Sequence, residues 1–128
     1  MEKNAIHLYL DDLRDCPSGF VLARSVEEAI RFFQSYDVGI LSLDHDLGED
    51  ERGNELPSGY DFVKYFCEHS LHARRIYLHT DNPVDRLNMY ETLLAAQRSG
   101  FIDPILWTSK RLGLTARRRL AYYETKQI

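Results

Sequence analysis

The six residues VGILSL at positions 38–43 would be apolar on both faces of a β-strand. A strand of this kind is typical of the middle of a parallel sheet, where helices cover both sides. The run continues directly into Asp44, His45 and Asp46. We therefore expect a central parallel strand, covered on both faces, with three ionisable side chains at its carboxyl end.

Strand-like and helix-like segments alternate along the rest of the chain. We predict strands at residues 5–10, 20–24, 38–43, 75–79 and 104–107. Apolar spacing and the N-cap signals of Ser25, Asn82 and Thr115 predict helices at residues 26–36, 60–70, 83–99 and 115–125. This alternation predicts one domain over residues 1–128, of the α/β class, with an open parallel sheet of five strands.

Composition limits the environment and the partners of the chain. The net charge of -4 argues against a broad nucleic-acid-binding surface, so nucleic acid is expected only as a phosphate-ended substrate. The basic cluster within residues 110–119 is interpreted as a solvated helix face. No apolar run is long enough to cross a bilayer, and the N-terminus lacks a signal-peptide core. Cys16 and Cys67 have no metal-type spacing. We therefore expect a cytoplasmic protein with reduced thiols and no membrane partner.

Acidic side chains follow predicted strands whose carboxyl ends would lie at one edge of the sheet, where ligands of such sheets bind. Two carboxylates about 4 Å apart repel by about 4 kcal/mol at an effective dielectric near 20. Protonation, basic neighbours or a bound cation would offset this repulsion. Oxygen ligands suit Mg²⁺ or Mn²⁺, which we expect as the cofactor. The expected metal ligands are Asp11, Asp12, Asp44 and Asp46.

Groups suited to phosphate flank the same edge. Arg14 follows the first acidic pair, and Arg86 lies in the first turn of the third predicted helix, whose N-terminus is an anion site. Carboxylates, a metal and arginines together indicate phosphoryl chemistry. The alternative is that Asp11, Asp81 and Asn82 serve only as turn residues or helix caps. The expected phosphate-binding residues are Arg14, Thr80, Asn82 and Arg86.

The candidate catalytic residues are Asp44, His45 and His79. Asp44 would bind the metal or attack phosphorus, and a histidine would move protons. His45 is equally suited to bind Mn²⁺ or Zn²⁺, or to point away, because neighbours on a strand alternate faces. His79 has the same ambiguity.

Several segments resemble the receiver domains of response regulators. Asp11 and Asp12 match the acidic pair of receivers, Asp44 at the end of VGILSLD matches the phospho-accepting aspartate, and Thr80 matches the hydroxyl residue after strand four. The resemblance implies a flavodoxin-like or receiver-like parallel sheet. Residues 13–19 leave room only for a short or missing first helix. The segment PILW lacks the Lys-Pro of ordinary receivers, and Lys110 comes three residues too late.

A narrower resemblance joins LDDLRDCPSGF, SLDHDLG, SGYD and HTDNP to a receiver-like family of bacteria and phages, the cyclic-phosphate-processing receiver domain. It implies that the chain processes or binds a phosphate-containing ligand, such as a cyclic phosphate. The matching residues are Asp11, Asp12, Arg14, Asp44, His45, Asp46, Gly59, Asp61, His79, Asn82 and Arg86.

Three functions stay open at this point. The first is a metal-dependent phosphoesterase. The second is a stand-alone signalling receiver phosphorylated on Asp44. The third is a non-catalytic module that binds a phosphorylated ligand or a partner protein. The same anion-binding edge serves the first and third, so the sequence does not decide whether the chain is an enzyme. It also leaves the substrate, the choice of metal and the oligomeric state open.

Overall fold

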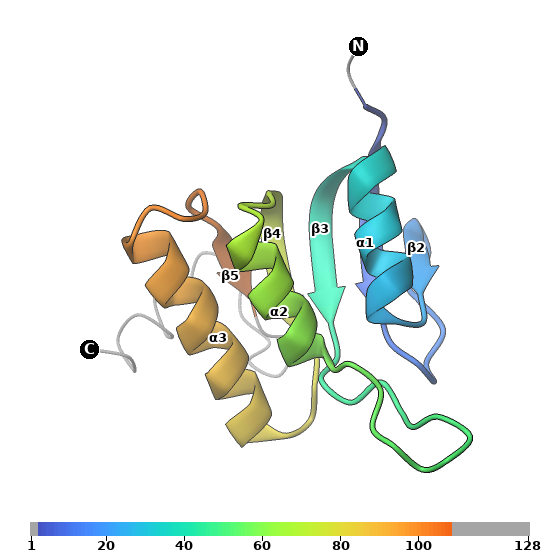
Figure 1. Ribbon diagram of the computed structural model, residues 1–128. Helices are drawn as coiled ribbons and strands as arrows, with labels where there is room; N and C mark the ends of the chain where they lie inside the picture. Colours follow the sequence, from blue (N-terminus) through green and yellow to red (C-terminus); the bar gives the residue numbers. More distant parts are fainter. Residues whose placement is uncertain (1–2, 109–128) are drawn as a thin grey trace.

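The computed structural model describes residues 3–108 (Figure 1). The helix expected at residues 115–125 and the basic cluster within residues 110–119 lie outside the described residues. The strands are β1 (Ala5–Leu10), β2 (Phe20–Ala23), β3 (Asp37–Leu43), β4 (Ala73–Leu78) and β5 (Leu106–Thr108). The helices are α1 (Val26–Ser35), α2 (Gly59–Glu68) and α3 (Pro83–Arg98).

The strands form one parallel sheet in the order β2-β1-β3-β4-β5. The predicted α/β class with a parallel sheet is confirmed, and β3 lies in the middle as its apolar sequence indicated. Residues 11–19 join β1 to β2 through bends and a turn, without a helix. β5 begins later than residue 104, because the backbone N–H of Ile105 donates to the Gln97 side chain at the end of α3.

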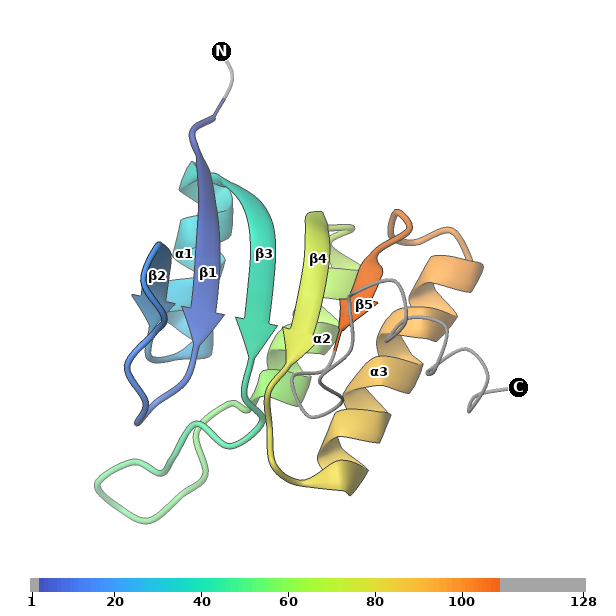
Figure 2. The same cartoon turned by 180° about the vertical axis from the view of Figure 1, so that it is seen from behind.

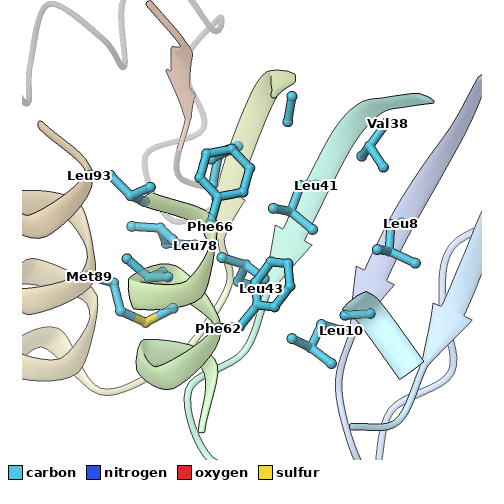
Figure 3. Close-up of a cluster of buried hydrophobic side chains, with 14 of the residues drawn as sticks. Leu8, Leu10, Val38, Leu41, Leu43, Phe62, Phe66, Leu78, Met89 and Leu93 are labelled. Carbon is cyan, nitrogen blue, oxygen red and sulfur yellow. The ribbon is translucent and has the colours of Figure 1, made fainter. Parts of the chain in front are cut away.

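The core lies between one face of the sheet and the three helices (Figure 3). Leu8, Leu41 and Ile76 are fully buried on the sheet side, and Phe62 and Leu93 are fully buried on the helix side. α1 and α2 bury apolar residues at the helical spacing that their sequences predicted. The apolar stripe predicted for α3 was wrong in part, because Val84 and Leu87 are exposed and the helix packs through Met89, Tyr90 and Leu93. Among the described helices, none is both long and apolar enough to cross a membrane.

The other face of the sheet differs from the expectation of helices on both sides. Within residues 3–108, α1 and α2 lie on the same side of the sheet, as Figures 1 and 2 show from opposite directions, and α3 packs against α2. The strand register places Tyr9, Ser42 and Tyr77 side by side in a row across β1, β3 and β4. Ser42 thus lies within an apolar strand but belongs to the row that alternates away from the helix-covered core.

Backbone hydrogen bonds extend the strand pairing into the loops at the carboxyl edge of the sheet. The N–H of Asp11 donates to the Ala23 carbonyl, that of Asp44 to Leu10, and that of His79 to Leu43. The strands are parallel, so these loops leave the sheet at the same edge, where the arrowheads of β1 and β3 point in Figure 2. The fold therefore fixes the backbones of three chemically important residues next to one another.

Candidate functional site

Asp11, Asp44 and His79 converge at the carboxyl edge. Each offers one ligand atom, and these three atoms lie within 4.8 Å of one another. The residues come from the ends of three adjacent strands, β1, β3 and β4, and their positions follow from the strand pairing described above. Two carboxylate oxygens and an imidazole nitrogen so close together are a set that divalent cations accept as ligands.

Asp11 is held rigidly by its own turn. Its Oδ1 atom accepts hydrogen bonds from the backbone N–H groups of Leu13 at 2.9 Å and Arg14 at 3.0 Å. Its Oδ2 atom lies 3.1 Å from Nε2 of His79. Burial by itself would raise the pKa of Asp11, but the backbone hydrogen bonds from Arg14 and Leu13 and the contact with His79 hold it below its ordinary value. The buried carboxylate is therefore ionised at neutral pH.

His79 is buried and has a partner at each ring nitrogen. Nδ1 lies 2.7 Å from Oγ of Ser42, and Nε2 faces Asp11. The ring stacks on Tyr9, with 4.3 Å between the ring centroids and 7° between the planes. Only 3% of the residue is exposed, so packing fixes the plane of the ring as well as its contacts.

Asp44 is the member of the cluster whose ionisation is disfavoured by its surroundings. Its Oδ1 atom accepts a hydrogen bond from the backbone N–H of His45 at 2.8 Å. Burial raises the pKa of Asp44 to about 6, and the charges of Asp11 and Asp12 add to the increase, although the His45 hydrogen bond opposes it. Repulsion between the carboxylates is therefore present in the cation-free protein. A bound cation would remove it.

A polar pocket of about 590 Å³ adjoins the loops that carry this cluster. Asp12, His45 and Asp46, which were expected in the site, line this pocket and do not belong to the three-residue group. Nδ1 of His45 lies 3.2 Å from an oxygen of Asp85 on α3. Oδ1 of Asp46 accepts a hydrogen bond from the N–H of Gly48 within its own loop. The expected site is thus divided between a three-residue cluster, in which Asp11 and His79 are buried and Asp44 is partly buried, and an acidic pocket beside it.

The residues expected to bind phosphate make contacts within the protein. Arg14 pairs with Asp81 at 2.8 Å, between exposed side chains. Arg86 donates to the backbone carbonyl of Thr80 at 3.0 Å. The side-chain oxygen of Asn82 caps α3 by accepting from two backbone N–H groups, and Oγ1 of buried Thr80 accepts from the Asn82 N–H. Asn82 therefore has the capping role that sequence reasoning kept as an alternative.

Sequence reasoning missed Ser42, Tyr9 and Asp85 as parts of the site. Ser42 carries the only hydroxyl in the run VGILSL, which was an available signal. Its contact with His79 spans 37 residues of sequence, however, and depends on the register between β3 and β4. No local pattern predicts such a contact.

The parallel sheet and its acidic carboxyl edge define a receiver-like α/β domain. The chain belongs to the family described as the cyclic-phosphate processing Receiver domain, which matches residues 6–95. The resemblance stated from the motifs is therefore confirmed. The matched region contains all three residues of the cluster. A comparison with curated proteins found no match.

Proposed function

We propose that the protein binds a divalent cation between Asp11, Asp44 and His79, and through it a phosphate-containing ligand such as a cyclic phosphate, which it hydrolyses. The observation that carries this proposal is the convergence of two carboxylates and one imidazole within 4.8 Å at the carboxyl edge of the sheet.

Charge balance supports a cation at this place. Asp11 is ionised, and Asp44 resists ionisation because it is partly buried and near other carboxylates. A divalent ion would favour the charged form of both and would hold them in the observed arrangement. Mg²⁺ and Mn²⁺ keep coordination positions for phosphate oxygens when only a few protein ligands bind them.

The adjoining pocket suits the rest of such a ligand. Its volume of about 590 Å³ is in the range of small-molecule sites. Its acidic lining would repel a bare phosphate, so the cation and Arg14 would supply the compensating charge. Thr80, Asn82 and Arg86 hold the β4–α3 loop in place and are proposed to flank the phosphate.

Hydrolysis of a cyclic phosphodiester adds water to phosphorus and breaks one ester P–O bond. The attacking water loses a proton, and the departing oxygen gains one. His45 lines the pocket with its Nδ1 held beside Asp85, which is the arrangement of a proton-transfer residue. A bound metal ion would polarise the phosphoryl oxygen. His79 is proposed as a ligand, and Asp44 as a ligand or as the nucleophile that attacks phosphorus.

The test is turnover of a panel of cyclic nucleotides and of RNAs that end in a cyclic phosphate, with Mg²⁺ or Mn²⁺. We expect product with the wild-type protein, a loss of about 100-fold or more in His45→Gln, and no loss in His72→Gln. His72 is the matched control because it precedes β4 at the opposite edge of the sheet. Absence of product with either metal would refute the enzymatic role.

A signalling receiver is the second candidate, and the position of Asp44 at the end of β3 favours it. In that case the Asp44 carboxylate takes a phosphoryl group from a small phosphodonor or a kinase, whose bond to phosphorus breaks, and beryllofluoride with Mg²⁺ would mimic the modified state. Binding of beryllofluoride that Asp44→Asn abolishes, combined with no hydrolysis, would favour this function. Stabilisation by phosphorylated ligands without either result would indicate a non-catalytic binding module.

A further inference from the structure

We infer that Ser42 is the positioning residue that lets His79 change from hydrogen-bond donor to metal ligand, and that the site therefore selects Mn²⁺ over Mg²⁺. The inference rests on the proposed function, since it requires a cation at Asp11 and Asp44. Its basis is the buried chain of contacts from Ser42 through both nitrogens of His79 to Asp11.

The hydrogen-bond donors and acceptors along this chain determine where the ring proton lies in the cation-free protein. The ionised carboxylate of Asp11 only accepts hydrogen bonds, so Nε2 of His79 must carry a proton to make its 3.1 Å contact. In the neutral ring, Nδ1 then has no proton and accepts from the hydroxyl of Ser42 at 2.7 Å. Ser42 is the donor in this state.

Cation binding requires the opposite tautomer. A metal ion binds the lone pair of a nitrogen, so Nε2 must lose its proton when it becomes a ligand. The neutral ring keeps one proton, which moves to Nδ1 through exchange with solvent. Oγ of Ser42 then accepts from Nδ1, because a hydroxyl can rotate from donor to acceptor.

Ser42 therefore satisfies the buried Nδ1 atom in both states. Its own proton has room to reorient, because Ser42 and His79 line a pocket of about 340 Å³ on the face of the sheet away from the helices. Stacking on Tyr9 holds the ring plane, so the change occurs by moving a proton and does not require the ring to turn. An alanine at this position would remove the hydroxyl that contacts Nδ1 at 2.7 Å.

The nitrogen ligand determines which ion is preferred. Mg²⁺ binds mainly oxygen and keeps its waters, whereas Mn²⁺ and the later divalent ions accept imidazole more readily. A partner behind the ring commonly raises metal affinity by 10- to 100-fold. The geometry therefore points to a site in which loss of the Ser42 hydroxyl weakens Mn²⁺ binding more than Mg²⁺ binding.

Two measurements at pH 8 test this inference. The first is isothermal titration of the full chain with Mn²⁺ and with Mg²⁺, in the wild type, Ser42→Ala and Ser42→Thr. We expect the wild type to bind Mn²⁺ at least 10-fold more tightly than Mg²⁺. Ser42→Ala should lose 10- to 100-fold in Mn²⁺ affinity, with less than a threefold change for Mg²⁺. Ser42→Thr keeps the hydroxyl and should stay within threefold of the wild type for Mn²⁺.

The second measurement follows the tautomer of His79 in the wild-type protein by nitrogen NMR, with diamagnetic Zn²⁺ as the probe. His79→Asn identifies its signals among the five histidines. We expect the proton on Nε2 without the ion and on Nδ1 with it. This NMR measurement needs no Ser42 variant, so it still tests the inference if Ser42→Ala does not fold.

The outcomes separate the two proposals. Equal affinity of the wild type for Mn²⁺ and Mg²⁺, unchanged Mn²⁺ affinity in Ser42→Ala, or a proton that stays on Nε2 with Zn²⁺ bound would overturn this inference and leave the cation site standing. Absence of binding by Mn²⁺, Mg²⁺ and Zn²⁺ would overturn both.

Discussion

At the scale of single residues, the ionisation of Asp44 makes the free energy of unfolding depend on pH. Its folded pKa of about 6 exceeds the ordinary value of 3.8. The folded protein therefore holds a proton on Asp44 between about pH 4 and pH 6, where the unfolded chain has released it. The stability associated with this group is fully present below pH 4 and is lost as the pH rises through 6. The rise of the Asp44 pKa from 3.8 to about 6 corresponds to at most about 3 kcal/mol of stability, and solvent screening at this half-buried group reduces that to about 1–2 kcal/mol.

Asp44→Asn is expected to stabilise the cation-free protein at pH 7.5 by about 1–2 kcal/mol, because the neutral amide keeps the shape without the charge. The difference should vanish at pH 4. Urea unfolding in the presence of a chelator at the two pH values measures it. A variant that is less stable than the wild type at pH 7.5 would contradict the electrostatic explanation of the raised pKa.

Gly59 is required where the loop after β3 enters α2. Its N–H donates to the His45 carbonyl at 2.7 Å, and an added Cβ would collide with the backbone carbonyl of Asp44. We expect Gly59→Ala to lower the free energy of unfolding by about 3 kcal/mol. The control is Gly53→Ala, where the positive φ costs about 1 kcal/mol but no atom lies within 4 Å. Similar losses in the two variants, measured by urea unfolding, would argue against close backbone packing at Gly59.

At the scale of secondary-structure elements, the start of α3 tests whether Asn82 is a cap. Its side-chain oxygen accepts from the N–H groups of Val84 and Asp85 at 2.9 and 3.2 Å. Asn82→Ala should therefore cost about 1 kcal/mol, whereas Asn82→Asp keeps the acceptor and should cost little. Denaturant unfolding compares the two. Equal destabilisation would show that the side-chain oxygen does not stabilise the helix.

The helices and strands could be predicted where the residues that determine them are close together in the sequence. The apolar run of β3 indicated a central parallel strand, and Ser25 and Asn82 were identified as caps that the structure confirms. The proximity of Asp11 and Asp44 could also be predicted, because the carboxyl ends of parallel strands lie at the same edge of a sheet. The contacts of His79 with Ser42 and Tyr9 were not predictable, because they depend on strand register between distant segments.

At the scale of the whole molecule, the residues that form the apolar core and the residues of the candidate site lie in different parts of the fold. Within residues 3–108 the helices cover one face of the sheet and enclose the apolar core, and Figure 3 shows the part of this core between the sheet, α2 and α3. The chemically important groups lie in the loops at the carboxyl edge, and the row of Tyr9, Ser42 and Tyr77 lies across the other face. Changes at the edge are therefore expected to alter ligand binding without dismantling the core.

Thermal unfolding with increasing Mn²⁺ at pH 7.5 tests most directly whether Asp11, Asp44 and His79 form one cation site. Binding to the folded state at about 100 times Kd adds about 2.7 kcal/mol, which should raise the Tm of the wild type by about 8 °C. Glu91→Gln, an exposed acid on α3, should respond like the wild type. Asp44→Asn should lose most of the increase. An equal increase in wild type and Asp44→Asn, or none in the wild type, would contradict the account.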